Sequence, residues 1–328
     1  MNIRVHLQGI MGLICGLALL GSLVHAQKGE AATYYVATNG SDSNPGTEAR
    51  PFQTLGGSVG KLGPGDTLYV KNGTYTGSLL LIGWPSGTSW DNPVTIAAYP
   101  GHSPVIRTQS GISALYLSYI SYIVIDGFFI DGTNGYDTIK ITTGSSHIRI
   151  QNSEIAYSLG NGIVMNNGAD GNELLHLQVH NNGKTGYDHG IYIASSDNIV
   201  EGCSIHDNSG YGVHVYNGSS LEANNNVIRS NEIYNNGWSG SGAGILLSSG
   251  DGNQANNNAI WGNNYVGGIY INYGASNTYV GGNTIYQNTY YGIYIGSGSS
   301  NAFIGFNSIY DNYGLSIVNE GVSTQLLP

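Results

Sequence analysis

Short apolar segments recur along most of this chain, and their spacing is regular. The repeated unit is Gly-Ile-x-Ile, a turn rich in Ser, Gly and Asn, a short strand, and then Asn-x-Ile-(His/Tyr)-x-Asn. Apolar and polar residues alternate within the segments with a period of two, which is typical of β-strands. The first apolar residues of successive units are Leu115, Ile139, Ile163, Ile191, Val213, Ile245, Ile269, Ile293 and Leu315. Their spacings range from 22 to 32 residues, so the pattern indicates a solenoid with one coil per repeat.

Other repeat architectures do not fit this pattern. No segment of the sequence has a sustained helical period, and the Leu-x-x-Leu-x-Leu motif of leucine-rich repeats is absent. A propeller blade needs about 40 residues, which exceeds this period. The sequence therefore predicts an all-β fold, a single-stranded right-handed parallel β-helix of about ten rungs, each of 22–32 residues and stacked about 4.8 Å apart. Residues 68–70 and 94–96 are expected in two earlier, less regular rungs.

Because the rungs stack, residues at the same position of successive repeats form a column along the coil. One column predicts an asparagine ladder of Asn182, Asn208, Asn236, Asn288 and Asn312. A second column contains Asn231, Asn258, Asn283 and Asn307, with Cys203 and Ser153 in equivalent places. We expect Cys203 to be a small buried core residue. An aromatic column, for which stacking on the wall is favoured over sugar binding, contains His180, His206, Tyr234, Trp261, Tyr286 and Tyr310.

The N-terminus and the charge balance indicate the compartment. A basic start, an apolar stretch over 10–23 and the small residue Ala26 follow the plan of a secretory signal. We predict a signal peptide over 1–26 and a secreted, extracellular β-helix domain over 27–328, with a capping coil at 33–75 and regular rungs at 94–320. Twenty acidic against ten basic residues argue against a nucleic-acid partner. Nothing after the signal resembles a membrane helix, and we expect a monomer.

Two stretches near the N-terminus carry a family resemblance. Residues 34–47 read YYVATNGSDSNPGT and are followed by PFQTL at 51–55. The turn GPGDTL at 63–68 and the segment NGTY at 72–75 extend the match. This opening resembles that of family-nine pectate lyases and their uncharacterised relatives, over roughly 33–320. The resemblance implies a right-handed β-helix and removal of the C5 proton of a uronic acid by a basic residue, with calcium neutralising the acid group. The family's aspartate cluster and lysine have no residue-by-residue counterpart here.

Ionisable residues are concentrated in the middle of the chain. No Lys, Arg or His follows Ile233, and six of the nine histidines lie between 147 and 214. The middle residue of each Ile-x-Ile unit points outward, which places Tyr192 and His214 on neighbouring strands, about one strand spacing apart. His189 enters its strand three residues before Tyr192. We therefore predict a catalytic centre of His189, Tyr192, His214 and Asp188.

Longer loops flank this centre. The same corner of the coil is lengthened by about four residues at 183–187 and again near 238–240, and two long loops on a rigid wall form a cleft. Lys140 belongs to the outward column of Tyr192, two rungs or about 10 Å away. The substrate-binding residues expected in or beside the cleft are Lys184, Tyr187, Arg229 and Lys140.

This constellation fits proton transfer. An imidazole acts as a base near neutral pH, a facing phenol transfers the second proton, and Asp188 would orient the ring. Tyr187-Asp188-His189 is similar to the Tyr, Asp and His that alginate epimerases carry in one rung, although the proline between Asp and His is missing. The alternative is structural: Asp188-His189-Gly190 is a turn whose side chains cap strand ends, and His214 is a wall residue.

Calcium is the candidate cofactor. Asp126, Asp131 and Asp137 fall in one predicted rung, with Glu154 one rung further, and clustered carboxylates suit calcium. The competing interpretation is that these carboxylates are solvated on the wall. No histidine spacing supports zinc.

These features favour an extracellular enzyme acting on a polysaccharide. The leading hypothesis is a lyase that cleaves an acidic, uronate-containing polymer by C5 proton abstraction and β-elimination. A uronate C5 epimerase and a noncatalytic glycan-binding or cell-surface solenoid are the alternatives. A glycosidase would need two carboxyls at a set separation, and no such pair stands out.

Overall fold

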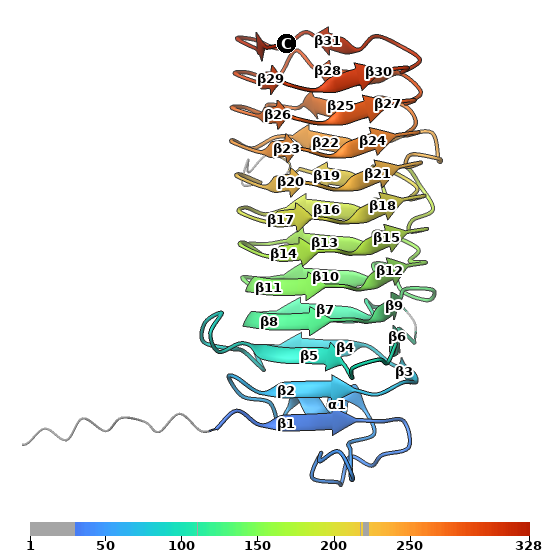
Figure 1. The fold of residues 1–328 in the computed structure, drawn as a ribbon, viewed down its shortest axis with the longest axis vertical. Coiled ribbons are helices and arrows are strands. Elements are labelled where there is room, and N and C mark those ends of the chain that lie inside the picture. Colours follow the sequence, from blue (N-terminus) through green and yellow to red (C-terminus); the bar gives the residue numbers. More distant parts are fainter. Residues whose placement is uncertain (1–29, 110, 217, 219–222) are drawn as a thin grey trace, which may run out of the picture. The chain divides into compact units, whose positions relative to one another are not determined.

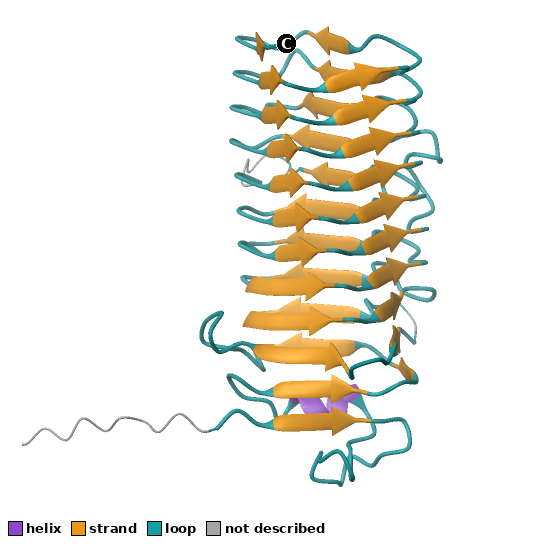
Figure 2. Cartoon of the chain, in the orientation of Figure 1, coloured by secondary structure: helices purple, strands orange, loops and turns teal. Residues whose placement is uncertain are grey.

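Three parallel strands, joined by short corners, make up each full rung of residues 31–328 (Figure 1). The computed structural model describes residues 30–109, 111–216, 218 and 223–328, so the predicted signal peptide over 1–26 lies outside the described residues. Residues 31–328 form one compact unit. Strands dominate it, and the short α1 (Leu55–Val59) lies at the N-terminal end (Figure 2). No helix among the described residues is long and apolar enough to cross a bilayer.

The strands form three parallel sheets along the coil. Sheet 1 contains β1 (Thr33–Val36), β2 (Thr67–Val70), β5 (Val94–Ala98), β8 (Ser121–Asp126), β11 (Ser146–Gln151), β14 (Glu173–Leu175), β17 (Ile199–Glu201), β20 (Val227–Arg229), β23 (Gln254–Asn256), β26 (Tyr279–Gly281), β29 (Phe303–Gly305) and β32 (Gln325–Leu326).

The other two sheets have ten strands each. Sheet 2 contains β4 (Leu79–Ile82), β7 (Leu115–Ser118), β10 (Ile139–Thr142), β13 (Ile163–Asn166), β16 (Ile191–Ala194), β19 (Val213–Val215), β22 (Ile245–Ser248), β25 (Gly267–Asn272), β28 (Tyr291–Ile295) and β31 (Ile317–Asn319). Sheet 3 contains β3 (Thr74–Thr76), β6 (Val105–Arg107), β9 (Phe129–Asp131), β12 (Glu154–Ala156), β15 (Gln178–His180), β18 (Ser204–His206), β21 (Glu232–Tyr234), β24 (Ala259–Trp261), β27 (Thr284–Tyr286) and β30 (Ser308–Tyr310).

The predicted apolar column is confirmed from Leu115 to Ile293. Each member pairs in parallel register with the next, and every side chain is 0–1% exposed. The last predicted member is wrong, because Ile317 pairs with Ile293 and Leu315 is 65% exposed. Leu315 and Ile317 are both apolar and lie two positions apart. The period-two alternation therefore fits either residue as the inward-facing member of the column.

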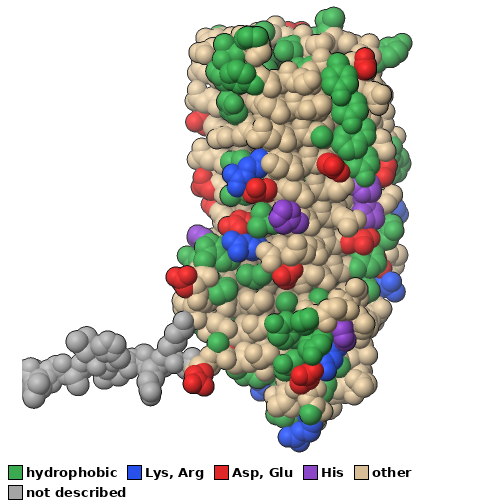
Figure 3. All heavy atoms as spheres, in the orientation of Figure 1, with side chains coloured by type: hydrophobic (Ala, Val, Ile, Leu, Met, Phe, Trp, Pro, Cys, Tyr) green, Lys and Arg blue, Asp and Glu red, His purple; other side chains and the backbone are tan. Residues whose placement is uncertain are grey.

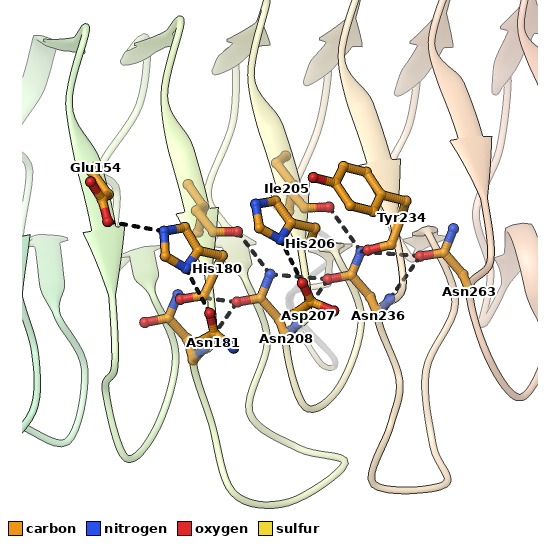
Figure 4. A network of polar contacts seen from close by, with 12 residues as sticks. Glu154, His180, Asn181, Ile205, His206, Asp207, Asn208, Tyr234, Asn236 and Asn263 are labelled. Carbon is orange, nitrogen blue, oxygen red and sulfur yellow. Dashed lines mark hydrogen bonds and ion pairs between the residues drawn. The ribbon is translucent and has the colours of Figure 1, made fainter.

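Both asparagine ladders are confirmed, and the first gains Asn263 between Asn236 and Asn288. Asn208 shows the arrangement: its Oδ1 accepts the backbone N–H and the Nδ2–H of Asn182, at 3.2 and 3.0 Å. Its own two N–H groups bind Asn236 Oδ1 in the next rung (Figure 4). The residue before the ladder position has a left-handed backbone, as at Asp207 with φ of 54°, and this makes the corner tight.

A third ladder was not predicted from the sequence. Asn172, Asn198, Asn226 and Asn253 bond in the same way at the corner that leads into sheet 1. Cys203 occupies its expected place in the second ladder and is 2% exposed. Burial raises the pKa of its thiol to about 12, so it is an inert core residue.

The aromatic column on sheet 3 is confirmed as a continuous stack. Successive ring centroids are 4.5–5.7 Å apart and the rings are within 11° of parallel from His180 to Tyr310. His180 also bonds to Glu154 through Nε2 at 3.1 Å (Figure 4). Hydrophobic and histidine side chains follow one another along this edge of the coil (Figure 3). Because each ring covers the face of its neighbour, the column offers sugar mainly ring edges.

We predict that Asn283→Leu lowers the free energy of unfolding by roughly 1–3 kcal/mol, the cost of leaving buried polar groups unpaired. Asn283 Oδ1 accepts two bonds from Asn258, and its Nδ2 donates to the carbonyl of Ala255. Chemical denaturation measures the change. Asn256→Leu is the matched control, because Asn256 faces outward and its Nδ2 binds only the Gln254 side chain among the described residues. Equal stability of the two variants would contradict the prediction.

Candidate active site

The outward column of sheet 2 brings the predicted centre together. Its register runs through Lys140, Val164, Tyr192, His214, Leu246, Tyr270 and Tyr294. Tyr192 therefore lies directly beside His214, and their ring centroids are 5.2 Å apart. His189 packs against both rings, with centroids 5.8 Å from Tyr192 and 4.6 Å from His214. The predicted proximity of these three side chains is confirmed.

The two imidazoles are directly hydrogen-bonded. Nε2 of His189 and Nδ1 of His214 are 2.9 Å apart. His189 is 5% exposed, whereas His214 is half-buried. Tyr211 and Tyr216 complete the cluster, and the Tyr216 ring stacks on His214 at 5.5 Å and 12°.

His189 also belongs to a ladder of its own, two residues before each strand of sheet 2. Asp137 Oδ1 accepts the backbone N–H of Asn161 at 3.0 Å, and Asn161 Oδ1 accepts the backbone N–H of His189 at 2.8 Å. His189 Nδ1 then accepts the backbone N–H of Tyr211 at 3.1 Å. In this ladder the side chain at one rung thus accepts a hydrogen bond from the backbone N–H of the next rung.

This ladder fixes the tautomers. A neutral imidazole has one acceptor and one donor nitrogen, and Nδ1 of His189 is the acceptor because a backbone amide donates to it. Its proton therefore lies on Nε2 and is donated to Nδ1 of His214. His214 in turn carries its own proton on Nε2. Both nitrogens of His189 are engaged, so it positions His214 and is not the free base that the sequence suggested.

Burial keeps the cluster uncharged near neutral pH. It lowers the pKa of His189 to about 4, although the charge of Asp188 acts in the opposite direction. Burial and then the neighbouring His189 lower the pKa of His214 well below its usual value. Burial and then Tyr216 raise the pKa of Tyr192.

Asp188 does not orient the imidazole. Its Oδ2 accepts the backbone N–H groups of Lys184 and Thr185 and the hydroxyl of Thr185, at 2.8–3.1 Å. The carboxylate therefore caps the 183–187 loop. This agrees with the alternative interpretation of the sequence, in which Asp188 has a structural role. The ring of His189 is oriented instead by Tyr211 and His214.

A groove of about 720 Å³ opens on the C-terminal side of the histidines. Its lining includes His189, His214, Tyr211, Tyr216 and Leu246, and further tyrosines from β25 and β28. Gly186 and Ser241 bring the two lengthened loops to its edge. The loops are in contact, since a Cβ added at Gly186 would lie 2.5 Å from Cβ of Ser241. The predicted cleft is therefore present, but the two loops meet at its edge and do not face each other across it.

The predicted substrate-binding residues divide into two groups. Tyr187 is 87% exposed and lines the groove, and the exposed Lys184 lies on the same loop. Lys140 lies on the column of Tyr192, two strands away. Arg229 was wrongly assigned: it lies in β20 of sheet 1 and pairs with Glu201 at 2.7 Å. Arg229 lies at the end of its strand, as the sequence indicated, but that strand belongs to a different face of the coil from the groove.

The three carboxylates expected to bind calcium do not cluster. Asp126 in β8 accepts bonds from Gln151 and Asn152 on sheet 1, and Asp131 in β9 pairs with Arg107 on sheet 3. Asp137 accepts from Asn161 beside sheet 2. They fall in one rung but on different faces of it. Among the described residues no group of three His, Cys, Asp or Glu is arranged to hold a metal, so these residues do not fit calcium.

Family models match nearly the whole described coil. Residues 34–186 match the Pel9A-like, right handed beta helix region, and residues 187–326 match the right handed beta helix region. The chain is a pectate lyase-like right-handed β-helix. Its coil has the fold that the opening motif and the repeat predicted.

Individual relatives of this pectate lyase-like β-helix match it in part. An uncharacterized protein YwoF of Bacillus subtilis is 30% identical over 141 residues, which are 39% of this chain and 30% of the relative. Pectate lyase PEL9 of Emericella nidulans is 37% identical over 76 residues, 23% of this chain and 18% of the lyase. The matches thus span less than a third of each of these two relatives. The crystal structure of an alginate lyase from Paenibacillus sp. str. FPU-7 has a TM-score of 0.64 at 19% identity and covers 88% of this chain and 99% of that one, which shows a common fold.

Sequence reasoning missed two site residues of this β-helix, Tyr211 and Tyr216. Tyr211 precedes Val213 by two positions, as His189 precedes Ile191, so the repeat register was a usable signal. Tyr216 follows His214 by two positions, so the period-two alternation over 213–216 was also a usable signal that both side chains share the outer face, where their rings stack.

The pKa of His189 predicts a pH-dependent stability. Below pH 6.5 the unfolded state binds a proton that the folded state resists until about pH 4, so stability is lost as the pH falls through this window. We expect His189→Asn to remove roughly 3 kcal/mol of the wild-type loss between pH 7 and pH 4. Asn is the matched replacement, because Asn161 makes the same bond one rung earlier. Denaturant unfolding at both pH values measures it, and parallel pH profiles would refute a buried neutral His189.

Proposed function

We propose that this β-helix is a polysaccharide lyase that cleaves a uronate-containing glycan by β-elimination at His214. The observation that carries the proposal is the groove in which hydrogen-bonded histidines and tyrosines meet, without Asp or Glu among its described lining residues. Hydrolysis by paired carboxylates needs two such groups across the bond. Elimination needs instead a proton acceptor at C5, a proton donor at the leaving oxygen and support for the developing negative charge.

His214 is suited to stabilising the negative charge that develops during elimination. Its Nδ1 is occupied by His189, so the proton on Nε2 makes this nitrogen a donor. A neutral donor held by packing stabilises the carboxylate of a bound uronate as charge develops on it, without first having to reorganise. His189 contributes by fixing the tautomer and the ring orientation.

The proton from C5 goes to an ionised tyrosine in this mechanism, and the phenol so formed gives it to the glycosidic oxygen as the C4–O bond breaks. Tyr192 and Tyr216 flank His214 on its two sides, and a phenolate is a stronger base than either buried imidazole. Since the pKa of Tyr192 is raised, its ionised fraction is small at neutral pH and increases in alkaline solution. Lys140 on the same column and Lys184 on the neighbouring loop provide positive charge for the uronate carboxylate.

The test is incubation with a panel of polysaccharides that contain 4-linked uronates, both homopolymers and heteropolymers, while the absorbance of the unsaturated product is followed. We expect product to form, at a rate that increases with pH above neutrality. His214→Ala should reduce turnover roughly 10²–10⁴-fold, and the larger loss among Tyr192→Phe and Tyr216→Phe identifies the proton acceptor. His206→Ala is the control, because this ring lies in the stack on sheet 3.

Two outcomes would contradict the lyase. Inversion at C5 without chain cleavage, measured by NMR, would identify the epimerase alternative. Binding without cleavage or inversion would identify a noncatalytic solenoid.

A further inference from the structure

The groove extends well beyond the proposed reaction centre. From His214 it runs over β22, β25 and β28, three strand spacings or about 14 Å further along the coil. Its distal part is lined by Tyr265, Tyr270, Tyr273, Tyr290, Tyr291 and Tyr294. This length accommodates a short oligosaccharide beyond the cleaved bond.

The lining of the distal groove is uncharged, and among the described residues the one carboxylate bonded to it, that of Glu320 at the hydroxyl of Tyr294 (2.9 Å), is negative. None of its described lining residues is Lys, Arg, Asp or Glu, and the sequence contains no Lys, Arg or His after Ile233. Burial raises the pKa of Tyr270 to about 12, so its phenol is neutral. A uronate carboxylate bound here would lose water without gaining a counter-charge, which is costly.

Tyr270, in the middle of the distal groove, differs in geometry from the rings of the aromatic column on sheet 3. Tyr270 is tilted by 51° from Tyr294 and by 58° from Tyr273, with centroids 5.2 and 6.4 Å apart. Tilted neighbours do not cover each other's faces as the parallel rings of the column do. Uncovered faces beside hydroxyl groups suit the C–H faces and hydroxyls of sugars.

A buried hydroxyl adds a neutral polar group. Ser248 lines the groove and is 0% exposed, and its Oγ has no hydrogen-bond partner among the described residues. Buried polar atoms are normally paired. Because the side chain is inaccessible from the groove, Ser248 contributes an uncharged floor beneath the tyrosines and makes no direct contact with a sugar.

We propose that the groove over β22, β25 and β28 selects neutral sugars, so that the substrate is a heteroglycan whose uronates are separated by neutral units. The position of the cleaved uronate rests on the proposed lyase function. The preference of the distal groove for uncharged sugars rests on its own lining, and binding measures it without turnover.

Titration calorimetry compares two oligosaccharides. One is the repeat unit of gellan, in which a single uronate is joined to neutral sugars, and the other is tetragalacturonate, which carries a carboxylate on every sugar. We expect the gellan repeat to bind at least about tenfold more tightly, a difference of about 1.4 kcal/mol. Equal or tighter binding of tetragalacturonate would overturn the proposal.

A matched pair of variants locates the binding. Tyr270→Ala should weaken binding of the gellan repeat about tenfold, whereas Tyr286→Ala removes the same atoms from the stack on sheet 3 and should leave binding unchanged. Both variants are checked for wild-type melting. Unchanged binding in Tyr270→Ala would overturn the assignment of this groove.

Turnover of gellan and polygalacturonate, followed in parallel, separates the two proposals. Faster cleavage of polygalacturonate would overturn the selectivity and leave the lyase function intact. No cleavage of either polymer, with the expected order of binding, would refute the lyase function and support the selectivity of the groove.

Discussion

The amide side chain of asparagine, bonded from one coil to the next, is the interaction on which this structure depends. The corners of a β-helix bury backbone amides that no strand can pair, and buried amides need acceptors. Within each ladder, an Asn accepts two N–H groups from the Asn of the rung before it, as Asn208 does from Asn182. A slip of one residue would break all three ladders and turn the apolar column outward. The stacking of His180 on His206 within 8° of parallel follows from this fixed register.

The proposed reaction centre uses the same device with different side chains. Along the corner that enters sheet 2, Asp137, Asn161 and His189 each accept the amide of the next rung. Where the acceptor is an imidazole, the bond that supports the coil also decides which nitrogen carries the proton. The orientation of His214 is therefore set by the scaffold before any substrate binds, which is the preorganisation that catalysis requires. As a consequence, both ring nitrogens of His189 are hydrogen-bonded within the protein, and neither is free to contact a substrate.

The distribution of charge separates the faces of the coil. Among the described residues, three carboxylates on sheets 1 and 3 are paired with arginines of adjacent rungs, Glu173 with Arg149, Asp131 with Arg107 and Glu201 with Arg229. Sheet 2 around the groove has tyrosines and neutral histidines instead. The chain has a formal charge of −10, yet an acidic polymer would meet an uncharged groove there. Aromatic residues likewise serve two purposes, forming one continuous stack on sheet 3 and, around Tyr270 on sheet 2, tilted rings.

Periodicity in the sequence determined the fold, the apolar column, two asparagine ladders, the aromatic stack and the adjacency of Tyr192 and His214. These features repeat once per coil, so alignment of the repeats is equivalent to alignment in space. Alignment fails where the period is ambiguous, as at Leu315 and Ile317. It also does not show which face of the coil a residue occupies, which is why Arg229 and the three aspartates were misplaced. Only the tertiary structure decided that Asp188 caps its loop, that Tyr211 holds His189, and that the groove is uncharged, because these depend on side-chain directions at corners that follow no period.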